Sequence, residues 1–471
     1  MEGRNLFQNN QPVVCIQGLG FVGTAMAVAV ANARDPDGSP CFNVVGVDLP
    51  TNEGLARIEA INAGALPFET QDQKLPDALR KAHSIDNLAA TANPVVYSLA
   101  SIIVVDVHLD VTYNGNTPSL ELEGFQAAIR TLGDVMRPGC LVIVETTVPP
   151  GACEKVVAPE LAAAMNKRGL PEDAFLLAHS YERVMPGKGY YDSIVNFWRV
   201  YAGHTPEAAA ACENFLSKVL NVKDYPLTRL GSTTASEIGK VLENSYRATN
   251  IAFMEEWGRF AEAVGVDLFE VISAIRKRPT HSNMRQPGFG VGGYCLTKDP
   301  LLAKLAAREL FGIEDMDFVF SALAVATNNA MPLVSLDKVQ EILGGSLNGK
   351  TILLLGASYR QDVGDTRYSP SQIFVENARE RGAHIICHEP MADYWPELDM
   401  KLSAELPSLN GIDAVVFAVP HEQYKKLNFN KWLNGSTPLF FDANNVISKE
   451  QRQGLRAAGC KVSAIGRGGE V

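Results

Sequence analysis

The sequence has no CxxC pair, and its eight cysteines stand at long spacings along 471 residues. Zinc sites and disulfide frameworks usually place cysteines in close, repeated pairs, so we expect no metal site and no disulfide framework. Most of the cysteines are predicted to be small, buried, apolar residues. Cys295 is the exception, because it follows a glycine-rich segment.

The sequence also lacks an apolar run that we judge long enough to cross a bilayer. Residues 1–5 do not show the charged-then-apolar layout of a secretory signal. The mean hydropathy is −0.01 and charged residues make up 20% of the chain, which is ordinary for a globular protein. We therefore expect a cytoplasmic protein that does not contact a membrane.

There is no excess of basic residues, because the net charge is −11. Nucleic-acid binders usually carry a basic domain or stripe, so a nucleic-acid partner is not expected. An anionic small ligand would have to be met locally, by individual lysines and arginines or by helix N-termini.

The order of predicted strands and helices indicates an α/β protein. Strand and helix patterns alternate near both ends of the chain, which predicts parallel sheets. Between them, Thr234 and Glu237 form a capping-box pattern that opens a helix reaching about residue 264. We expect two Rossmann-like parallel-sheet domains joined by a central all-helical domain. The predicted strands are 13–17, 43–48, 102–107, 141–144, 351–355, 383–387, 414–419 and 438–441.

A glycine motif follows the first predicted strand and opens the first predicted helix. Gly18, Gly20 and Gly23 enclose Phe21 and Val22, and Asp48 ends the next strand. This arrangement is typical of a dinucleotide site, in which the glycines admit a pyrophosphate and the acid binds a ribose. It predicts NAD rather than NADP as the cofactor. The alternative is a glycine turn without a ligand.

Two further patterns are ambiguous by themselves. Residues 287–293 carry four glycines before Cys295, and Lys298 and Asp299 follow it. For a lone cysteine, a buried structural role is the more common explanation. Lys240, Asn244 and Arg247 fall on one helical face, and from the pattern alone a solvated polar stripe is the more common explanation.

Six segments in the same order resemble the UDP-glucose/GDP-mannose dehydrogenase family over nearly the whole chain. The segments 182–187 and 243–252 are similar to the UDP-N-acetylhexosamine dehydrogenase branch in particular. The resemblance implies domains over 1–215 (NAD binding), 216–335 (central, dimerising) and 336–471 (UDP-sugar binding), and at least a homodimer. The six segments are 18–23, 144–151, 180–187, 243–252, 292–295 and 355–370.

The resemblance also implies a reaction. NAD takes two hydrides from the C6 hydroxymethyl group of a UDP-sugar, and the uronic acid forms through a thioester on Cys295. Lys240 and Asn244 would hold the reacting oxygen, with Asp299 beside them. The remaining implied roles fall to Glu182 and Thr147 in proton and water transfer, and to Arg183, Arg247, Gly292, Gly293, Arg360 and Arg367 in substrate binding.

Several positions depart from the family pattern. His108 stands within a segment that usually reads Val-Pro-Thr-Pro, and Tyr294 stands where that branch usually has histidine. The arginine that members often send to a partner's substrate falls at His281, with Arg278 and Arg285 nearby.

These departures leave alternatives open. Lys298 and Asp299 after the cysteine resemble the UDP-glucose 6-dehydrogenase branch. The changes at His108 and Tyr294 are compatible with a sugar-nucleotide-binding homologue that has lost catalysis. A simple two-electron dehydrogenase is a third hypothesis, but such an enzyme would not need Cys295.

Overall fold

The structure is a computed structural model that describes residues 7, 9–114 and 117–468. Its residues form two compact units, one of residues 1–242 with 302–317 and one of residues 243–301 with 318–471. Helices α8 (Thr233–Ala263) and α10 (Tyr294–Glu309) each contribute residues to both units. The three domain boundaries expected from the sequence stay a prediction.

The first unit contains an eight-stranded sheet in the order β10-β9-β8-β7-β4-β1-β2-β3. All pairs in it are parallel except β8 with β9, so the predicted parallel sheet is confirmed for its larger part. The strands are β1 (Val13–Gln17), β2 (Asn43–Val47), β3 (Leu88–Thr91), β4 (Ala100–Val105), β7 (Cys140–Val144), β8 (Phe175–His179), β9 (Val200–Gly203) and β10 (Thr228–Arg229).

Helices cover both faces of this sheet because its central strands are apolar on both sides. Val14 and Ile16 of β1 belong to one core, and Cys15 between them belongs to the other. The first core packs under α1 (Phe21–Ala31), α2 (Asn52–Asn62), α3 (Lys74–Ile85), α6 (Tyr190–Val195) and α7 (Pro206–Val219). The second packs under η1 (Pro94–Leu99), α4 (Glu123–Gly133), η2 (Cys153–Val157) and α5 (Ala158–Lys167). A hairpin of β5 (Asp110–Asn114) and β6 (Thr117–Glu121) completes the unit.

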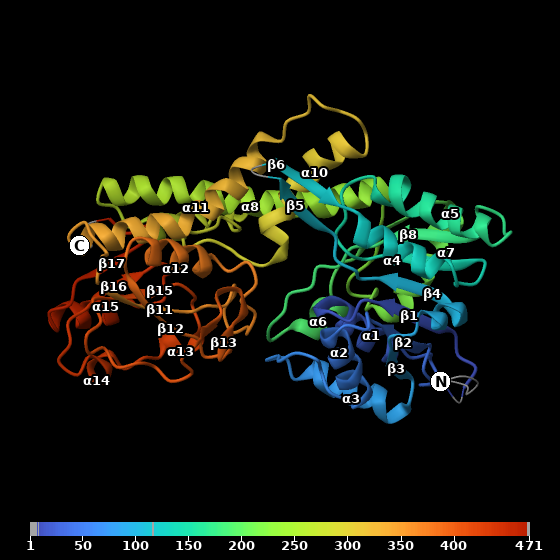
Figure 1. Ribbon diagram of the computed structural model, residues 1–471, viewed down its shortest axis with the longest axis horizontal. Helices are drawn as coiled ribbons and strands as arrows, with labels where there is room; N and C mark the ends of the chain where they lie inside the picture. The colour runs from blue at the N-terminus through green and yellow to red at the C-terminus, as the bar shows by residue number, and fades with distance from the viewer. Residues whose placement is uncertain (1–6, 8, 115–116, 469–471) are drawn as a thin grey trace. The chain divides into compact units, whose positions relative to one another are not determined.

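The second unit contains a fully parallel five-stranded sheet in the order β12-β11-β15-β16-β17. Helices α11 (Val319–Ile342) and α12 (Pro370–Glu380) cover one face, as Figure 1 shows, while α13 (Glu422–Lys425), α14 (Phe429–Leu433) and α15 (Lys449–Ala457) cover the other. The strands are β11 (Thr351–Leu355), β12 (His384–His388), β15 (Ala414–Phe417), β16 (Leu439–Asp442) and β17 (Val462–Ala464). A small ribbon pairs β13 (Tyr394–Trp395) with β14 (Met400–Lys401), joined by η4 (Pro396–Leu398).

The stretch between the two sheets is helical, as predicted, with α9 (Leu268–Ile275) and η3 (Pro279–His281) between α8 and α10. The predicted capping box at the start of α8 is wrong. The helix begins at Thr233, and the Ser232 hydroxyl accepts the Ala235 N–H at 3.1 Å. Glu237 is buried instead, and its carboxylate accepts the N–H groups of Gly151 and Cys153 at 2.5 and 2.8 Å. Ser232 therefore caps the helix in place of Thr234, and Glu237 binds a backbone segment far away in the sequence.

Helix α11 corrects a second expectation. By length and composition alone it is apolar enough to cross a membrane, although core helices that are mostly buried pass the same test. Leu336 and Val339 on this helix are fully buried in the second unit's core. Packing against β11 and α12 accounts for the apolar character of that end of the helix.

Candidate active site

The turn between β1 and α1 forms an open cradle. Gly18 has a φ of +94°, and a Cβ on Gly23 would lie 1.9 Å from the Gly18 carbonyl oxygen, so both positions require glycine. A Cβ on Gly20 would meet nothing within 4 Å. Helix α1 begins at Phe21 with no side-chain cap and no acidic residue in its first turn. Its N–H groups are therefore available to an anion, which fits the pyrophosphate of a dinucleotide.

Asp48 lies directly after β2, where a ribose-binding acid is expected. Its carboxylate accepts the N–H of Leu19 at 3.1 Å and that of Leu49 at 2.8 Å. Arg57, which the sequence did not single out, pairs with the same carboxylate at 3.3 Å. A carboxylate has about four acceptor positions, so it can still accept a ribose hydroxyl.

Lys240 and Glu182 form the polar centre of the first unit. The Lys240 ammonium group donates to the Glu182 carbonyl oxygen at 2.7 Å and to its carboxylate at 3.1 Å. Both side chains are largely buried. Arg183 donates to the Trp198 carbonyl oxygen at 2.8 Å and lies over the Tyr181 ring. Thr147 is half-buried after β7, and its role stays a prediction.

A buried acidic group lies beside the cradle and was missed in the sequence. Asp106 follows β4, and its carboxyl oxygens are buried next to Gly23, whose Cβ would lie 3.2 Å from that of Asp106. Glu145, which follows β7, pairs with buried Arg199. Burial and then the neighbouring Glu145 raise the pKa of Asp106 well above its ordinary value. The Arg199 guanidinium pairs with Glu145, and its charge also acts on Asp106, where it opposes the rise in pKa.

Cys295 lies in the first turn of α10 and is exposed, whereas the other seven cysteines are buried. One turn further on, Asp299 is buried and accepts the Asn244 amide at 2.7 Å and the Lys298 ammonium at 3.1 Å. Asn244 lies one turn after Lys240 on α8, so the predicted polar stripe is not solvated at these two positions. The second unit therefore joins Asn244 and Asp299 near an accessible thiol.

Arginines gather around a cavity of about 250 Å³ in the second unit. Arg276, Arg285 and Asn444 line it, together with glycines of the segment before Cys295. Burial and then the charges of Arg247 and Arg276 lower the pKa of Arg285. Among the described residues Arg247, Arg276 and Arg285 make no ion pair, although Arg276 donates to the Met284 carbonyl oxygen, so an anion would relieve their repulsion. The sequence had named Arg247 as a substrate residue, and Arg276 and Asn444 were missed.

The two remaining predicted arginines follow β11. Arg367 makes a bidentate ion pair with Asp365, with donor–acceptor distances of 2.9 and 2.5 Å. Arg360 is exposed. A larger cavity of about 590 Å³ lies at the start of α15 and is lined by four basic residues. Arg467 and Lys425 pair with Asp267 and Glu422, and Arg452 donates to the Ile447 carbonyl oxygen. Lys449 is the fourth.

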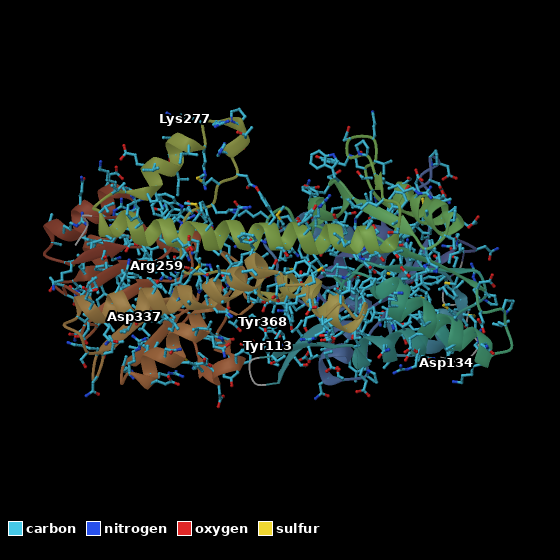
Figure 2. The ribbon with its side chains drawn as sticks, turned by 90° about the horizontal axis from the view of Figure 1, so that it is seen from above. Tyr113, Asp134, Arg259, Lys277, Asp337 and Tyr368 are labelled. Carbon is cyan, nitrogen blue, oxygen red and sulfur yellow. The ribbon has the colours of Figure 1, made fainter. Side chains whose placement is uncertain are left out.

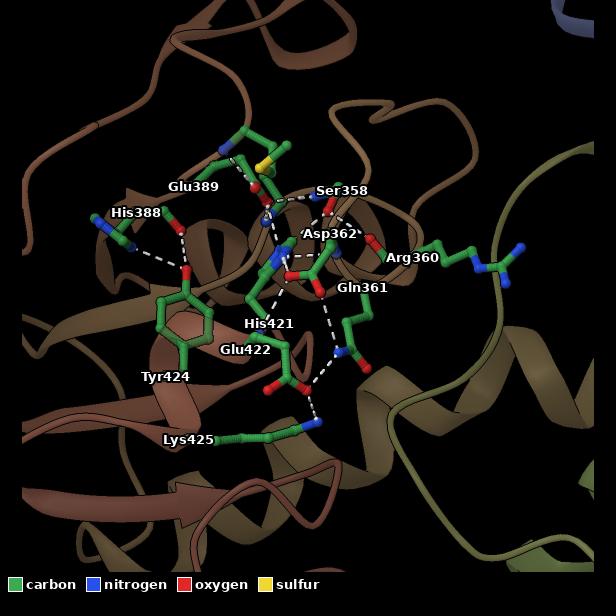
Figure 3. Close-up of polar contacts among 12 residues, drawn as sticks. Ser358, Arg360, Gln361, Asp362, His388, Glu389, His421, Glu422, Tyr424 and Lys425 are labelled. Carbon is green, nitrogen blue, oxygen red and sulfur yellow. Dashed lines mark hydrogen bonds and ion pairs between the residues drawn. The ribbon is translucent and has the colours of Figure 1, made fainter. Parts of the chain in front are cut away.

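Buried His421 fixes the segment that carries Arg360, as Figure 3 shows. Its Nδ1 accepts the Asp362 N–H at 2.9 Å, so the proton of the neutral ring belongs on Nε2. That nitrogen lies 3.2 Å from both the Glu389 carboxylate and the Ser358 hydroxyl. These contacts give His421 a structural role in this segment.

Such a cradle at the carboxyl edge of a parallel sheet, with Asp48 at the next strand, defines an NAD-dependent oxidoreductase. Residues 12–219, 234–329 and 353–449 match in turn the NAD binding, central and UDP binding domains of one family. The chain belongs to the UDP-glucose/GDP-mannose dehydrogenase family.

Relatives match over almost the full length. UDP-N-acetyl-D-mannosamine dehydrogenase of Pyrococcus horikoshii is 28% identical over 97% of this chain and 99% of that protein. Its structure has a TM-score of 0.79 at 27% identity, with 97% and 99% of the two chains covered. NDP-N-acetyl-D-galactosaminuronic acid dehydrogenase of Ralstonia nicotianae is 28% identical over 89% of this chain and 93% of that protein. The fold is also similar to that of a UDP-glucose dehydrogenase of Pyrobaculum islandicum, at 24% identity over 99% of this chain and 100% of that one, with a TM-score of 0.80.

Proposed function

We propose that this chain oxidises the C6 hydroxymethyl group of a UDP-N-acetylhexosamine to a carboxylate, through a thioester on Cys295. The observation that carries the proposal is the exposure of Cys295 in the first turn of α10, one turn before the buried Asn244–Asp299 pair. A helix N-terminus favours a thiolate, which is the nucleophile that a thioester requires.

The residues of the chain take separate roles in this reaction. Lys240 and Asn244 hold the substrate oxygen as negative charge develops on it. Loss of one hydride from C6 and of the hydroxyl proton to water gives the aldehyde. The Cys295 thiolate then adds to the aldehyde carbon, and loss of a second hydride leaves the thioester. Glu182 takes a proton from the water that cleaves the thioester and releases the thiolate. NAD, when bound, would accept one hydride in each of the two oxidations, so each sugar consumes two NAD.

The substrate class rests on charge and on the relatives. Arg247, Arg276 and Arg285 lack a counter-ion among the described residues, and a nucleoside diphosphate would supply one. Relatives of full length are named for UDP-N-acetylmannosamine and for an NDP-N-acetylgalactosaminuronic acid. We infer the same class of N-acetylated sugar for this chain, with the diphosphate near these arginines.

We also propose that the chain forms a homodimer through α8. Large apolar side chains recur from the middle to the end of this helix, and about half of each is exposed: Tyr246, Phe253, Trp257 and Phe260. At 100° per residue they fall within an arc of about 60°. A narrow apolar stripe of this kind is typical of helices that pack against a partner helix.

The test follows NADH absorbance over a panel of UDP-N-acetylhexosamines and UDP-glucose. The expected result is two NADH for each UDP-N-acetylhexosamine consumed, and weaker turnover of UDP-glucose. Cys295→Ser should stop steady turnover, because a serine hydroxyl is a much weaker nucleophile than a thiolate. Cys460→Ser, which changes a buried cysteine outside the proposed site, is the control.

Three outcomes would reject parts of the proposal. One NADH per sugar with released aldehyde indicates a two-electron dehydrogenase. Preference for UDP-glucose rejects the N-acetylated substrate. Binding of UDP-sugars without any turnover indicates a homologue that has lost catalysis.

A further inference from the structure

Tyr294, directly before Cys295, joins two segments of the second unit. Its ring lies 4.8 Å from the ring of Tyr368, which is labelled in Figure 2, at an angle of 68°. The Arg367 guanidinium lies 5.0 Å from the centre of the same ring. Tyr294 therefore touches the segment after β11 while Cys295, its neighbour, carries the thiol. Both distances are within the range of favourable aromatic and cation–π contacts.

The glycines before Tyr294 make this contact possible. A Cβ on Gly292 would lie 2.2 Å from the Tyr368 carbonyl oxygen and 2.9 Å from the Tyr359 Cβ. Gly293 has a φ of +78°, and its Cβ would lie 2.9 Å from the Tyr359 ring. The start of α10 thus lies directly against residues 359–368, with no room for a side chain between them.

Arg367 is held from two sides. Asp365 binds its guanidinium with two hydrogen bonds, of 2.9 and 2.5 Å, and Tyr294 covers it. The Asp365 hydrogen bonds, and next its charge, raise the pKa of Arg367 against the effect of burial. The ring of Tyr294 is thus the contact between a charged group after β11 and the turn that presents the thiol.

We propose that Tyr294 is a positioning residue whose ring couples nucleotide binding at Arg367 to the placement of Cys295. The proposal rests on the proposed function, and it adds that the Arg367 segment contacts the UDP part of the substrate whose diphosphate lies near Arg247, Arg276 and Arg285. The Tyr294 ring covers the Arg367 guanidinium and its hydroxyl also hydrogen-bonds that group, so the two parts of the side chain are tested separately. Occupation of the Arg367 segment by UDP then changes the reactivity of the neighbouring thiol.

The first test is a double-mutant cycle with UDP as the probe, measured by isothermal titration calorimetry. Tyr294→Leu should weaken UDP binding by about 3- to 10-fold, which corresponds to one partly buried cation–π contact. In the Arg367→Ala background the same change should have little effect, because the partner of the ring is gone. Tyr294→Phe and Tyr294→His keep a ring but lose the hydroxyl that hydrogen-bonds Arg367, so each should weaken UDP binding less than Tyr294→Leu does. Tyr394→Leu removes an exposed tyrosine of β13 and is the matched control.

The second test reads the thiol directly. Because the other seven cysteines are buried, iodoacetamide should label Cys295 first. UDP should change the labelling rate in the wild type and in Tyr294→Phe, but not in Tyr294→Leu. Intact-protein mass confirms single labelling, and circular dichroism confirms that each variant is folded.

The outcomes separate this inference from the proposed function. If UDP does not bind the wild type, the proposed function fails. If UDP binds but the losses from Tyr294→Leu and Arg367→Ala simply multiply, the coupling through the ring is rejected and the proposed function stands. If Tyr294→Leu does not fold, the response of Tyr294→His to UDP in the labelling test decides, since loss of the UDP effect there also rejects the inference.

Discussion

At the scale of single residues, the surroundings of Asp106 oppose a negative charge on its carboxyl group. Its carboxyl oxygens are buried, and its neighbours are the carboxylates of Glu145 and Glu182 and the guanidinium of Arg199. Because its pKa in the folded protein lies above the ordinary value of 3.8, the folded state binds more protons than the unfolded chain between those two values. This group therefore lowers the stability as pH rises through that interval.

Asp106→Asn should accordingly raise the stability at pH 8, because it removes a buried charge and keeps the size of the side chain. We expect the melting temperature to rise by a few degrees, and the gain to shrink as pH falls toward 4. Differential scanning fluorimetry from pH 4 to pH 8 measures both. Asp173→Asn, at an exposed position, should show neither effect. A gain that is independent of pH would contradict the explanation.

The residues whose places in the fold the sequence predicted best are those with a signal in their near neighbours. Gly18, Gly23 and Asp48 stand at fixed positions relative to strand ends, so their places followed from the pattern, and their roles in binding stay predictions. Asp106 and Arg276 carry no such local signal. Glu145 helps to raise the pKa of Asp106, and Arg276 repels the charge of Arg285 together with Arg247. Only the folded chain brings these groups near one another.

At the scale of elements, the predicted strands agree with the observed ones to within about two residues, because short apolar runs between turns are strong local signals. The start of α8 was less predictable. Thr234 and Glu237 have the spacing of a capping box, but Glu237 satisfies the buried N–H groups of Gly151 and Cys153 instead. The side chain of a local capping pattern can be used elsewhere, where a distant backbone N–H group would otherwise be buried without an acceptor.

Helix α8 also determines where the cation of the proposed reaction lies. Lys240 is largely buried against Glu182 and one turn before Asn244. We expect Lys240→Ala to lower kcat by about 100- to 1000-fold, with a small effect on KM, because it removes a donor to the developing oxyanion. Steady-state kinetics, followed by NADH absorbance, measure the effects on kcat and on KM separately.

The control for this variant is Arg259→Ala, which removes a half-exposed cation from the same helix. Loss of Lys240 also leaves Glu182 without its partner, so circular dichroism at the assay temperature must show that the variant is folded. A folded Lys240→Ala variant with a near-normal kcat would assign Lys240 to the structure alone.

At the scale of the whole molecule, the apolar stripe on α8 sets an expectation for assembly. Trp257 lies near the middle of the stripe, and its ring contacts those of Phe253 and Phe260 at 6.3 and 6.1 Å. Exposed aromatic residues grouped in this way are typical of the centre of a protein interface. Arg259 points about 160° away from Trp257 around the helix, so it tests the opposite face.

Trp257→Glu should therefore convert a dimer into a monomer, because it would bury an unpaired carboxylate in an apolar contact. The wild type should have a mass of about 102 kDa by light scattering after size exclusion, twice the 51.0 kDa of one chain. We expect the dissociation constant of the variant to rise by about 30-fold or more, as for the loss of a central aromatic contact. Arg259→Ala should remain a dimer. A wild type that is monomeric at micromolar concentration would reject the homodimer, and a dimeric Trp257→Glu variant would place the interface away from this stripe of α8.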